Sequence, residues 1–135
     1  MNYKFTIPGQ MQNLNDYLAA ERIKFKTPYG KTNTNGNVMK QKWMEYVVTY
    51  IRKDLRRVHI ERPVKIHYAF YEPNCKRDMD NIASFAMKII QDSLVKANVL
   101  SNDGWRNIIG FECEFFVSNK QPRIEVTLEE RWMED

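Results

Sequence analysis

Residues 76–105 read KRDMDNIASFAMKIIQDSLVKANVLSNDGW, and the interpretation of the whole chain starts from them. Apolar residues recur at positions 82, 85, 86, 89, 90, 94 and 97, which is the period of an amphipathic helix. The pattern predicts a helix over Ile82–Ala97 that packs through this apolar stripe. The opposite, polar face carries residues at four-residue steps: Ser84, Lys88, Asp92 and Lys96.

Acidic residues flank this helix at both ends. Asp78 and Asp80 precede it, and Asp103 follows it in a turn. Two carboxylates two residues apart in an extended segment point the same way and repel each other unless a cation lies between them. Mg²⁺ or Mn²⁺ with oxygen ligands is the natural occupant, so we predict a metal site at these three aspartates. Helix capping by Asp80 or Asn81, and a simple tight turn at Asp103, remain as structural alternatives.

Chain geometry limits how Asp103 can reach the other two acids. The helix rises about 24 Å between positions 81 and 97 at about 1.5 Å per residue, whereas the six residues after it span roughly 20 Å when extended. Asp103 therefore meets Asp78 and Asp80 only if residues 99–102 run back along the helix. Val99 and Leu100 are the apolar residues that we expect to anchor this return.

Length and composition favour one small intracellular domain. A chain of 135 residues fits a single two-layer core, so we expect one domain over residues 1–135. No run approaches the roughly 20 apolar residues of a membrane-spanning helix, and the first residues lack the apolar run of a signal peptide. Cys75 and Cys113 match neither a CxxC pair nor a disulfide framework, which favours reduced thiols and a cytoplasmic location.

Charge is unevenly distributed along the chain. Residues 1–65 contain 13 Lys and Arg against 5 Asp and Glu, whereas residues 66–135 contain 8 against 12. This asymmetry permits a basic nucleic-acid-binding surface beside an acidic centre, although solvated faces also collect charge.

Periodicity elsewhere predicts an α/β (α+β) domain in which helices cover a mixed sheet. We expect the last two strands to form a hairpin through residues 118–122. The predicted elements are a strand at Tyr3–Ile7, a helix from a cap at Asn15 or Asp16 to Ile23, a polar loop at 27–37, a helix at Val38–Arg57, and strands at Val64–Tyr71, Ile108–Val117 and Arg123–Glu130.

Several basic residues are candidates for contact with DNA phosphates. The polar loop either merely connects two elements or acts as a flexible arm, and the long helix carries either a solvated face or a DNA track. His59 and His67 have no partner at metal spacing and are expected to be structural or exposed. The candidate DNA-binding residues are Lys24, Lys26, Lys31, Arg52, Lys53, Arg56, Arg57, Lys76 and Arg77.

A carboxylate-bound metal beside a basic surface indicates phosphodiester hydrolysis. The ion would polarise a phosphoryl oxygen and lower the pKa of a bound water. Lys88 would add positive charge near the scissile phosphate.

Five short motifs in this region together resemble the RusA family of Holliday junction resolvases. The resemblance implies a Mg²⁺-dependent homodimeric endonuclease that cuts four-way DNA junctions in recombination and repair, in a bacterial or phage-infected cell. It also implies that Asp78, Asp80 and Asp103 are metal or catalytic residues and that Lys88 is the catalytic lysine. The motifs are Arg77-Asp78-Met79-Asp80-Asn81, Lys88, Asp92-Ser93-Leu94, Ala97-Asn98-Val99 and Asn102-Asp103.

The chain departs from the family pattern at three positions. The family lysine one turn after the Asp-Asn pair is replaced by Ser84, and Lys88 lies one turn farther along. Either Lys88 reaches back to the acids, or position 84 has lost the role. Asn102 replaces the first Asp of the closing pair, and Asn98 replaces a Gly that ends the helix.

Two other functions fit the same residues. A related nuclease would prefer flaps or replication forks to four-way junctions. A non-catalytic DNA-binding protein would use the Asp-x-Asp-Asn segment only to cap a helix.

Overall fold

The structure is a computed structural model, and it describes residues 1–132. Helices and strands follow the predicted order, with two additional short strands near the N-terminus. The elements are β1 (Asn2–Pro8), α1 (Leu14–Glu21), β2 (Lys24–Lys26), β3 (Thr32–Thr34), α2 (Asn35–Leu55), β4 (Val64–Glu72), α3 (Met79–Lys96), β5 (Ile108–Val117) and β6 (Arg123–Glu130).

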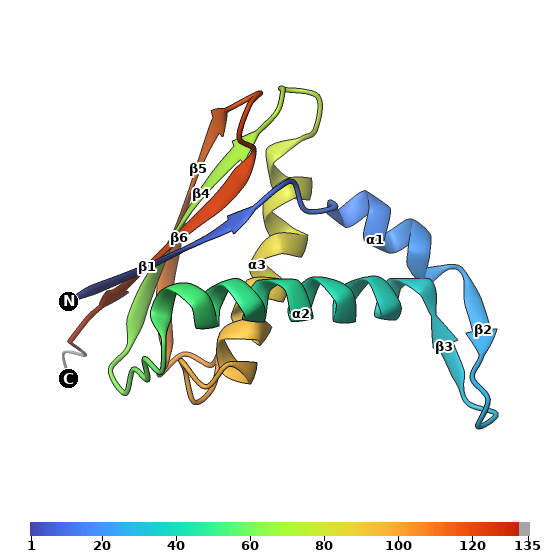
Figure 1. Ribbon diagram of the computed structural model, residues 1–135, viewed down its shortest axis with the longest axis horizontal. Helices are drawn as coiled ribbons and strands as arrows, with labels where there is room; N and C mark the ends of the chain where they lie inside the picture. Colours follow the sequence, from blue (N-terminus) through green and yellow to red (C-terminus); the bar gives the residue numbers. More distant parts are fainter. Residues whose placement is uncertain (133–135) are drawn as a thin grey trace.

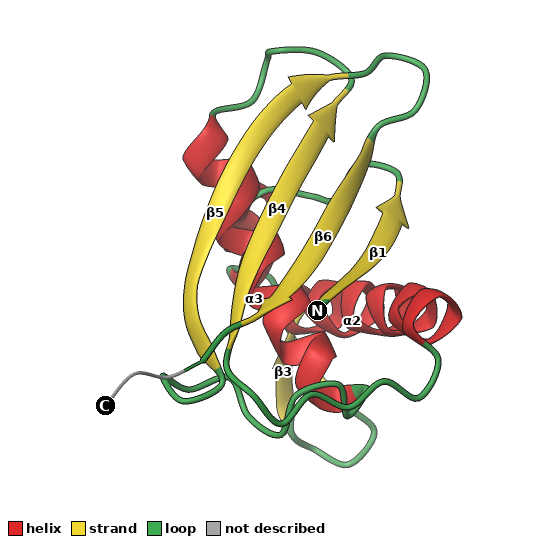
Figure 2. Ribbon diagram, turned by 90° about the vertical axis from the view of Figure 1, so that its left-hand side faces the viewer, coloured by secondary structure: helices red, strands yellow, loops and turns green. Residues whose placement is uncertain are grey.

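Four strands form the main sheet in the order β1-β6-β4-β5. Strands β4 and β5 are parallel, whereas β6 is antiparallel to both of its neighbours, so the sheet is mixed. Helices α2 and α3 lie together on one face of it (Figures 1 and 2). This confirms the predicted α+β class as a single small domain. Within residues 1–132, no helix is long and apolar enough to cross a membrane.

The core lies between this face of the sheet and the two long helices. Strand β4 alternates buried and half-buried residues along its whole length, with Ile66, Tyr68 and Phe70 facing the helices. The apolar stripe of α3 is buried against them, as its period predicted. Val99 and Leu100 are 2% and 1% exposed, which confirms them as the anchors of the segment that follows α3.

The predicted hairpin between the last two strands is wrong, because β4 lies between β5 and β6. The helical crossover through α3 returns the chain parallel to β4 and fills its outer side. Strand β6 must then pair with the edge of β4 that faces away from β5. Residues 118–122 cross the end of β4, where the Ser118 amide donates to the Glu72 carbonyl at 2.7 Å. A five-residue polar loop can form either a hairpin turn or a connection that crosses the end of β4, so its composition did not discriminate between the two.

The N-terminal boundaries also differ from the prediction. Helix α1 is capped by Asn13, not by Asn15 or Asp16, and Asp16 instead closes the capping box. The predicted loop at 27–37 contains strand β3, which pairs with β2, and the first turn of α2. Thr34 caps α2 and also donates to Glu21 at 2.6 Å, and these local polar bonds give no apolar period to detect.

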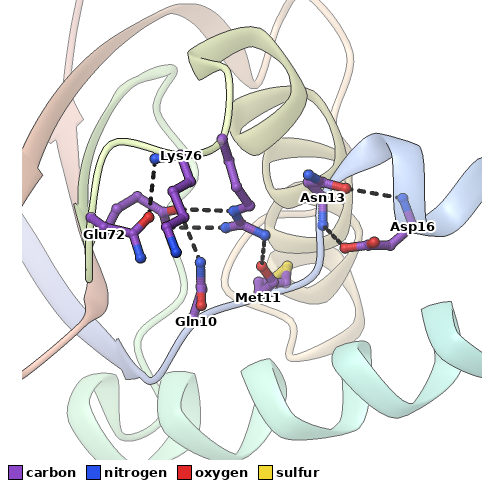
Figure 3. A network of polar contacts seen from close by, with 8 residues as sticks. Gln10, Met11, Asn13, Asp16, Glu72 and Lys76 are labelled. Carbon is purple, nitrogen blue, oxygen red and sulfur yellow. Dashed lines mark hydrogen bonds and ion pairs between the residues drawn. The ribbon is translucent and has the colours of Figure 1, made fainter.

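A buried ion pair fixes the loop that leads from β4 into α3 (Figure 3). Glu72 is only 8% exposed, and both of its oxygens accept hydrogen bonds from Arg77, at 2.9 and 3.0 Å. A third guanidinium nitrogen donates to the Met11 carbonyl at 2.8 Å, and Gln10 donates to Glu72 at 3.1 Å. The residue immediately before Asp78 is therefore held to β4 and to the segment between β1 and α1.

Replacing Arg77 by Met should destabilise the fold by about 3 kcal/mol, because Glu72 would remain buried without its counter-ion. The double substitution Glu72→Gln/Arg77→Met should recover part of that loss, since both charges are then absent. Urea unfolding of the wild type, both single variants and the double variant measures the coupling. Strictly additive losses would contradict a direct interaction between the two side chains.

Candidate functional site

The first part of the site is the N-terminus of α3. Asp78 occupies the N-cap position with an extended backbone, but its carboxylate makes no capping hydrogen bond to any described residue. Asp80 lies in the first turn, and one of its oxygens accepts from the Asn81 amide at 3.0 Å. Both side chains are exposed. Helix capping therefore does not account for Asp78, and both carboxylates face solvent where the dipole of α3 favours negative charge.

The second part is an ion network farther along the same helix. The Lys88 ammonium lies 3.2 Å from Asp92, one turn ahead, and 3.9 Å from Asp103. Lys40 of α2 lies 3.3 Å from the other oxygen of Asp92. Asp92 is thus shared by two lysines and links α2, α3 and the segment that carries Asp103. At 20% side-chain exposure it is the most sheltered member of the network.

The segment after α3 returns along the helix as expected, but Asp103 stops at the level of Lys88. Lys88 lies eight residues beyond Asp80, which corresponds to about 12 Å along the helix axis. Across residues 1–132 there is no group of three or more His, Cys, Asp or Glu side chains that could hold a metal ion. One chain therefore presents two acids at the start of α3 and a third acid beside Lys88.

The chemistry of the donors fits a hard divalent cation. Asp78 and Asp80 are exposed carboxylates two residues apart, and oxygen ligands are what Mg²⁺ and Mn²⁺ prefer. Asp103 is also a carboxylate, but its ion-pair partner among the described residues is Lys88, at 3.9 Å. Of the predicted donor set, Asp78 and Asp80 therefore lie at the same end of α3.

Ser84 lies between the two parts of the site on the exposed side of α3. Its hydroxyl donates to the Asp80 carbonyl at 2.6 Å, a local bond within the helix. Lys88, in contrast, contacts two carboxylates that lie toward the C-terminal half of the helix. The lysine therefore pairs with Asp103 and not with the acids before it.

Six of the nine predicted DNA-binding residues form two clusters at opposite ends of α2. Lys24, Lys26 and Lys31 lie on the β2–β3 hairpin, which projects from the body of the protein (Figure 1). At the other end, Arg52, Arg56 and Arg57 line a recess of about 550 Å³. The predicted helix to Arg57 ends earlier, at Leu55, and Arg56 and Arg57 follow with φ angles of 26° and 55°.

The remaining three candidates differ in their surroundings. Lys53 lies near the ring of Tyr50, and Lys76 is exposed in the loop before Asp78. The Arg77 guanidinium is bonded to Glu72 and Met11, so its principal contacts are structural. This role was not evident from the sequence, because the predicted strand ended at Tyr71 and no pattern singled out Glu72.

Both histidines bond to neighbouring groups. A hydrogen bond to the Asn98 carbonyl, with a further contribution from Glu61, raises the pKa of His59. His67 lies between Glu112 and Glu129, at 3.3 and 3.5 Å. These contacts agree with the structural interpretation of both residues.

Sequence reasoning missed Lys40 and undervalued Asp92. The i, i+4 spacing of Lys88 and Asp92 was a usable signal for their ion pair. Nothing in the sequence placed Lys40 beside them, because that contact depends on how α2 crosses α3. A recess of about 820 Å³ between residues 8–12 and the first half of α2 is lined by no acidic residue of the described chain and by no member of this network.

Comparison with known proteins agrees with the motifs. The family model described as endodeoxyribonuclease RusA matches residues 18–129, which include both parts of the site. No curated protein matches the chain. Because the match spans most of the 135 residues, the chain belongs to the RusA family of endodeoxyribonucleases.

Proposed function

We propose that this protein is a divalent-metal-dependent endonuclease that resolves four-way DNA junctions by paired phosphodiester cuts, in recombination and repair. The observation that carries the proposal is the family match combined with two exposed carboxylates, Asp78 and Asp80, at the start of a buried helix. Neither carboxylate is required for the fold in the way that Glu72 is. Two uncompensated acids on a DNA-cleaving protein are best explained by cation binding.

Asp78 and Asp80 are the residues that would hold Mg²⁺ or Mn²⁺, with Asp103 as the third ligand. The cation would supply a Lewis acid for the phosphoryl oxygen and a lower pKa for attacking water. Asp78 and Asp80 would orient the reacting groups. Their own positions are restrained, because the Glu72–Arg77 pair fixes the backbone immediately before Asp78. Preorganisation of this kind keeps the carboxylates in place when a phosphate approaches.

Lys88 supplies the positive charge. In the free protein its ammonium is balanced by Asp92 and Asp103. With Asp103 serving as a metal ligand, Lys88 would retain Asp92 as its anchor and would be able to direct its remaining donors at a phosphate oxygen. Asp92 is therefore a positioning residue, and Lys40 holds Asp92 from the other helix.

The basic clusters account for affinity. Each lies at one end of α2, and a helix of 21 residues spans about 30 Å. Lysines on the hairpin and arginines after α2 would contact phosphates of separate arms, which adds affinity without base recognition. A homodimer follows from the substrate, since a two-fold symmetric junction requires two related cuts.

Substituting Asp78 or Asp80 by Asn should reduce junction cleavage roughly 100-fold or more while junction binding persists, because the change removes ligand charge but no phosphate contact. The control is Asp54→Asn. Asp54 lies at the C-terminal end of α2, where its side chain accepts a hydrogen bond from the Thr6 amide. Gel-based cleavage of labelled four-way junctions, flaps and forks in Mg²⁺ and in Mn²⁺ measures both activity and preference.

The outcome of that assay separates the alternatives. Faster cutting of flaps or forks would replace the junction by another branched substrate. Binding of every substrate without cutting in either metal would leave a non-catalytic DNA-binding protein. Full activity of the Asp78→Asn variant would refute the role given to the carboxylate.

Lys88 and Ser84 can be compared directly, because they are neighbouring positions on the same helix face. Lys88→Met should slow cleavage about 100-fold through the loss of charge near the phosphate. Ser84→Ala should change it by less than about threefold, since its hydroxyl bonds only to backbone. Single-turnover rates with saturating enzyme would measure the chemical step, and the reverse ranking would move the catalytic role to position 84.

A further inference from the structure

The recess of about 820 Å³ between residues 8–12 and the first half of α2 contains none of the residues of the predicted cleavage site. Its volume falls within the range of small-ligand pockets, roughly 300–1,000 Å³. Within residues 8–12, Pro8 and Gln12 bond to side chains of α2, whereas Gln10 and Met11 bond to side chains of the loop region before α3. Figure 3 shows Gln10 between that loop and α2. This segment therefore separates the recess from the candidate cleavage site.

One wall of the recess is an aromatic pair on α2 that other contacts hold in place. The Trp43 indole donates to Gln12 at 2.9 Å and lies nearly perpendicular to the Tyr46 ring, with 5.5 Å between the ring centroids. The Tyr46 hydroxyl in turn donates to the Pro8 carbonyl at 2.7 Å. Because both rings are already fixed, a flat ligand that stacks on them would require little ordering of side chains.

Polar groups at the rim offer both hydrogen-bond donors and acceptors. Gln12 accepts the bond from Trp43 through its carbonyl oxygen, so its amide group retains its donors. The amide nitrogen of Gln10 bonds to the end of β4, which leaves its carbonyl oxygen as an acceptor. Asn35 adds an exposed amide and Lys42 an exposed ammonium. An aromatic wall with mixed amides and a cation suits a nucleobase that is attached to a phosphodiester.

The recess lies between the basic hairpin and the carboxylates at the start of α3. Asn35 is the first residue of α2 and follows β3 directly, and its amide donates to the Ile23 carbonyl at the base of the hairpin, at 2.9 Å. Figure 1 shows the β2–β3 hairpin at this end of α2. On the other side, Gln10 bonds to Glu72, which anchors the loop before Asp78. A DNA strand that runs from the hairpin lysines to the carboxylates would pass the recess.

We propose that this recess binds one unpaired nucleobase of a branched DNA substrate, stacked on Trp43, and that this contact favours branched DNA over linear duplex. The inference rests on the proposed function, because it takes DNA as the substrate, but its site lies outside the carboxylates and Lys88. A base within a duplex must be extruded before it can enter, whereas a base at an open branch point need not be. Every base has a face that can stack, so the contact would sense strand structure more than sequence.

Abasic substitution in the DNA tests the contact without altering the protein. The probe is a fork with two unpaired thymidine arms, compared with forks in which one arm nucleotide at a time lacks its base. One position should weaken binding about tenfold, since stacking on an aromatic side chain contributes that much, and its neighbours should change binding less than about twofold. Fluorescence anisotropy without divalent metal measures the affinities. No position with more than about a twofold effect would overturn the proposal.

Trp43 can report on its own contact. Trp105 and Trp132 are 93% and 75% exposed, and replacing both by Phe leaves Trp43 as the single tryptophan. Its fluorescence should be quenched by the fork, and not by the fork with the critical abasic position or by a linear duplex. Equal quenching by fork and duplex would overturn the selectivity. Quenching by free thymidine monophosphate with none by the fork would overturn DNA as the occupant.

Two substitutions of Trp43 separate stacking from packing. Trp43→Phe keeps an aromatic face and Trp43→Leu keeps only apolar bulk, while both lose the bond to Gln12. The Leu variant should bind the fork about tenfold more weakly and the duplex within about twofold of wild type, and the Phe variant should bind the fork within about threefold. Equal losses of the Leu variant on both DNAs would overturn the proposal. If this variant does not fold, as judged by thermal unfolding, the abasic series on the wild type decides.

Lys31→Ala is the matched control, because this hairpin lysine is a predicted phosphate contact. It should weaken fork and duplex binding equally and lower the salt dependence of both. The outcomes also separate this site from the nuclease. A wild type that cuts no branched DNA in Mg²⁺ or Mn²⁺, but responds to one abasic position, would refute the nuclease and support the recess. Cleavage of four-way junctions with no response to any abasic position would do the reverse.

Discussion

Burial of one helical stripe against one strand determines where every polar group of the site can lie. The stripe of α3 that includes Ile82, Ile89 and Leu94 packs on Ile66 and Phe70 of β4, and these residues are almost completely removed from water. Burying side chains of this size contributes roughly 1.5–3 kcal/mol each, so the helix cannot rotate or slide without losing much of the stability of the domain. The opposite face, with Asp80, Lys88 and Asp92, is fixed as a consequence.

One turn of that helix changes the relation between the charged groups. Because α3 is held by its core face, a side chain four positions later in the sequence lies about 6 Å farther along the helix axis and points in nearly the same direction. Lys88 therefore still faces solvent, but it meets Asp92 and Asp103 instead of the acids at the helix start. The chain keeps the residue types of the family pattern at a different spacing, and Lys88 pairs with Asp92 and Asp103. Asp103 follows Lys88 because Val99 and Leu100 anchor its segment in the core.

The sequence predicted those elements whose side chains repeat with a clear period. The alternation in Val64–Tyr71 and the stripe in residues 82–97 are direct consequences of burial on one face, so their positions could be inferred without a structure. Strand β3 and the cap at Asn13 depend on local polar bonds with no period. The position of β4 between β5 and β6, and the contact of Lys40 with Asp92, depend on the packing of distant segments. For the site, the residue types were predictable, whereas their distances were not.

The distribution of charge supports the proposed cation site at the start of α3. Asp78 and Asp80 would repel a DNA backbone, and the neighbouring Arg77 offers little compensation because both of its charged hydrogen bonds go to Glu72. The basic clusters at the two ends of α2 lie about 30 Å apart, several times the screening length of about 8 Å at physiological ionic strength. Each cluster therefore attracts its own stretch of backbone and cannot neutralise carboxylates elsewhere. Lys76 is the exposed cation nearest to Asp78 along the chain, and one lysine does not balance two acids. At the proposed site, a divalent ion would remove this repulsion at the point where a phosphate must approach, and metal binding and DNA binding would then be cooperative.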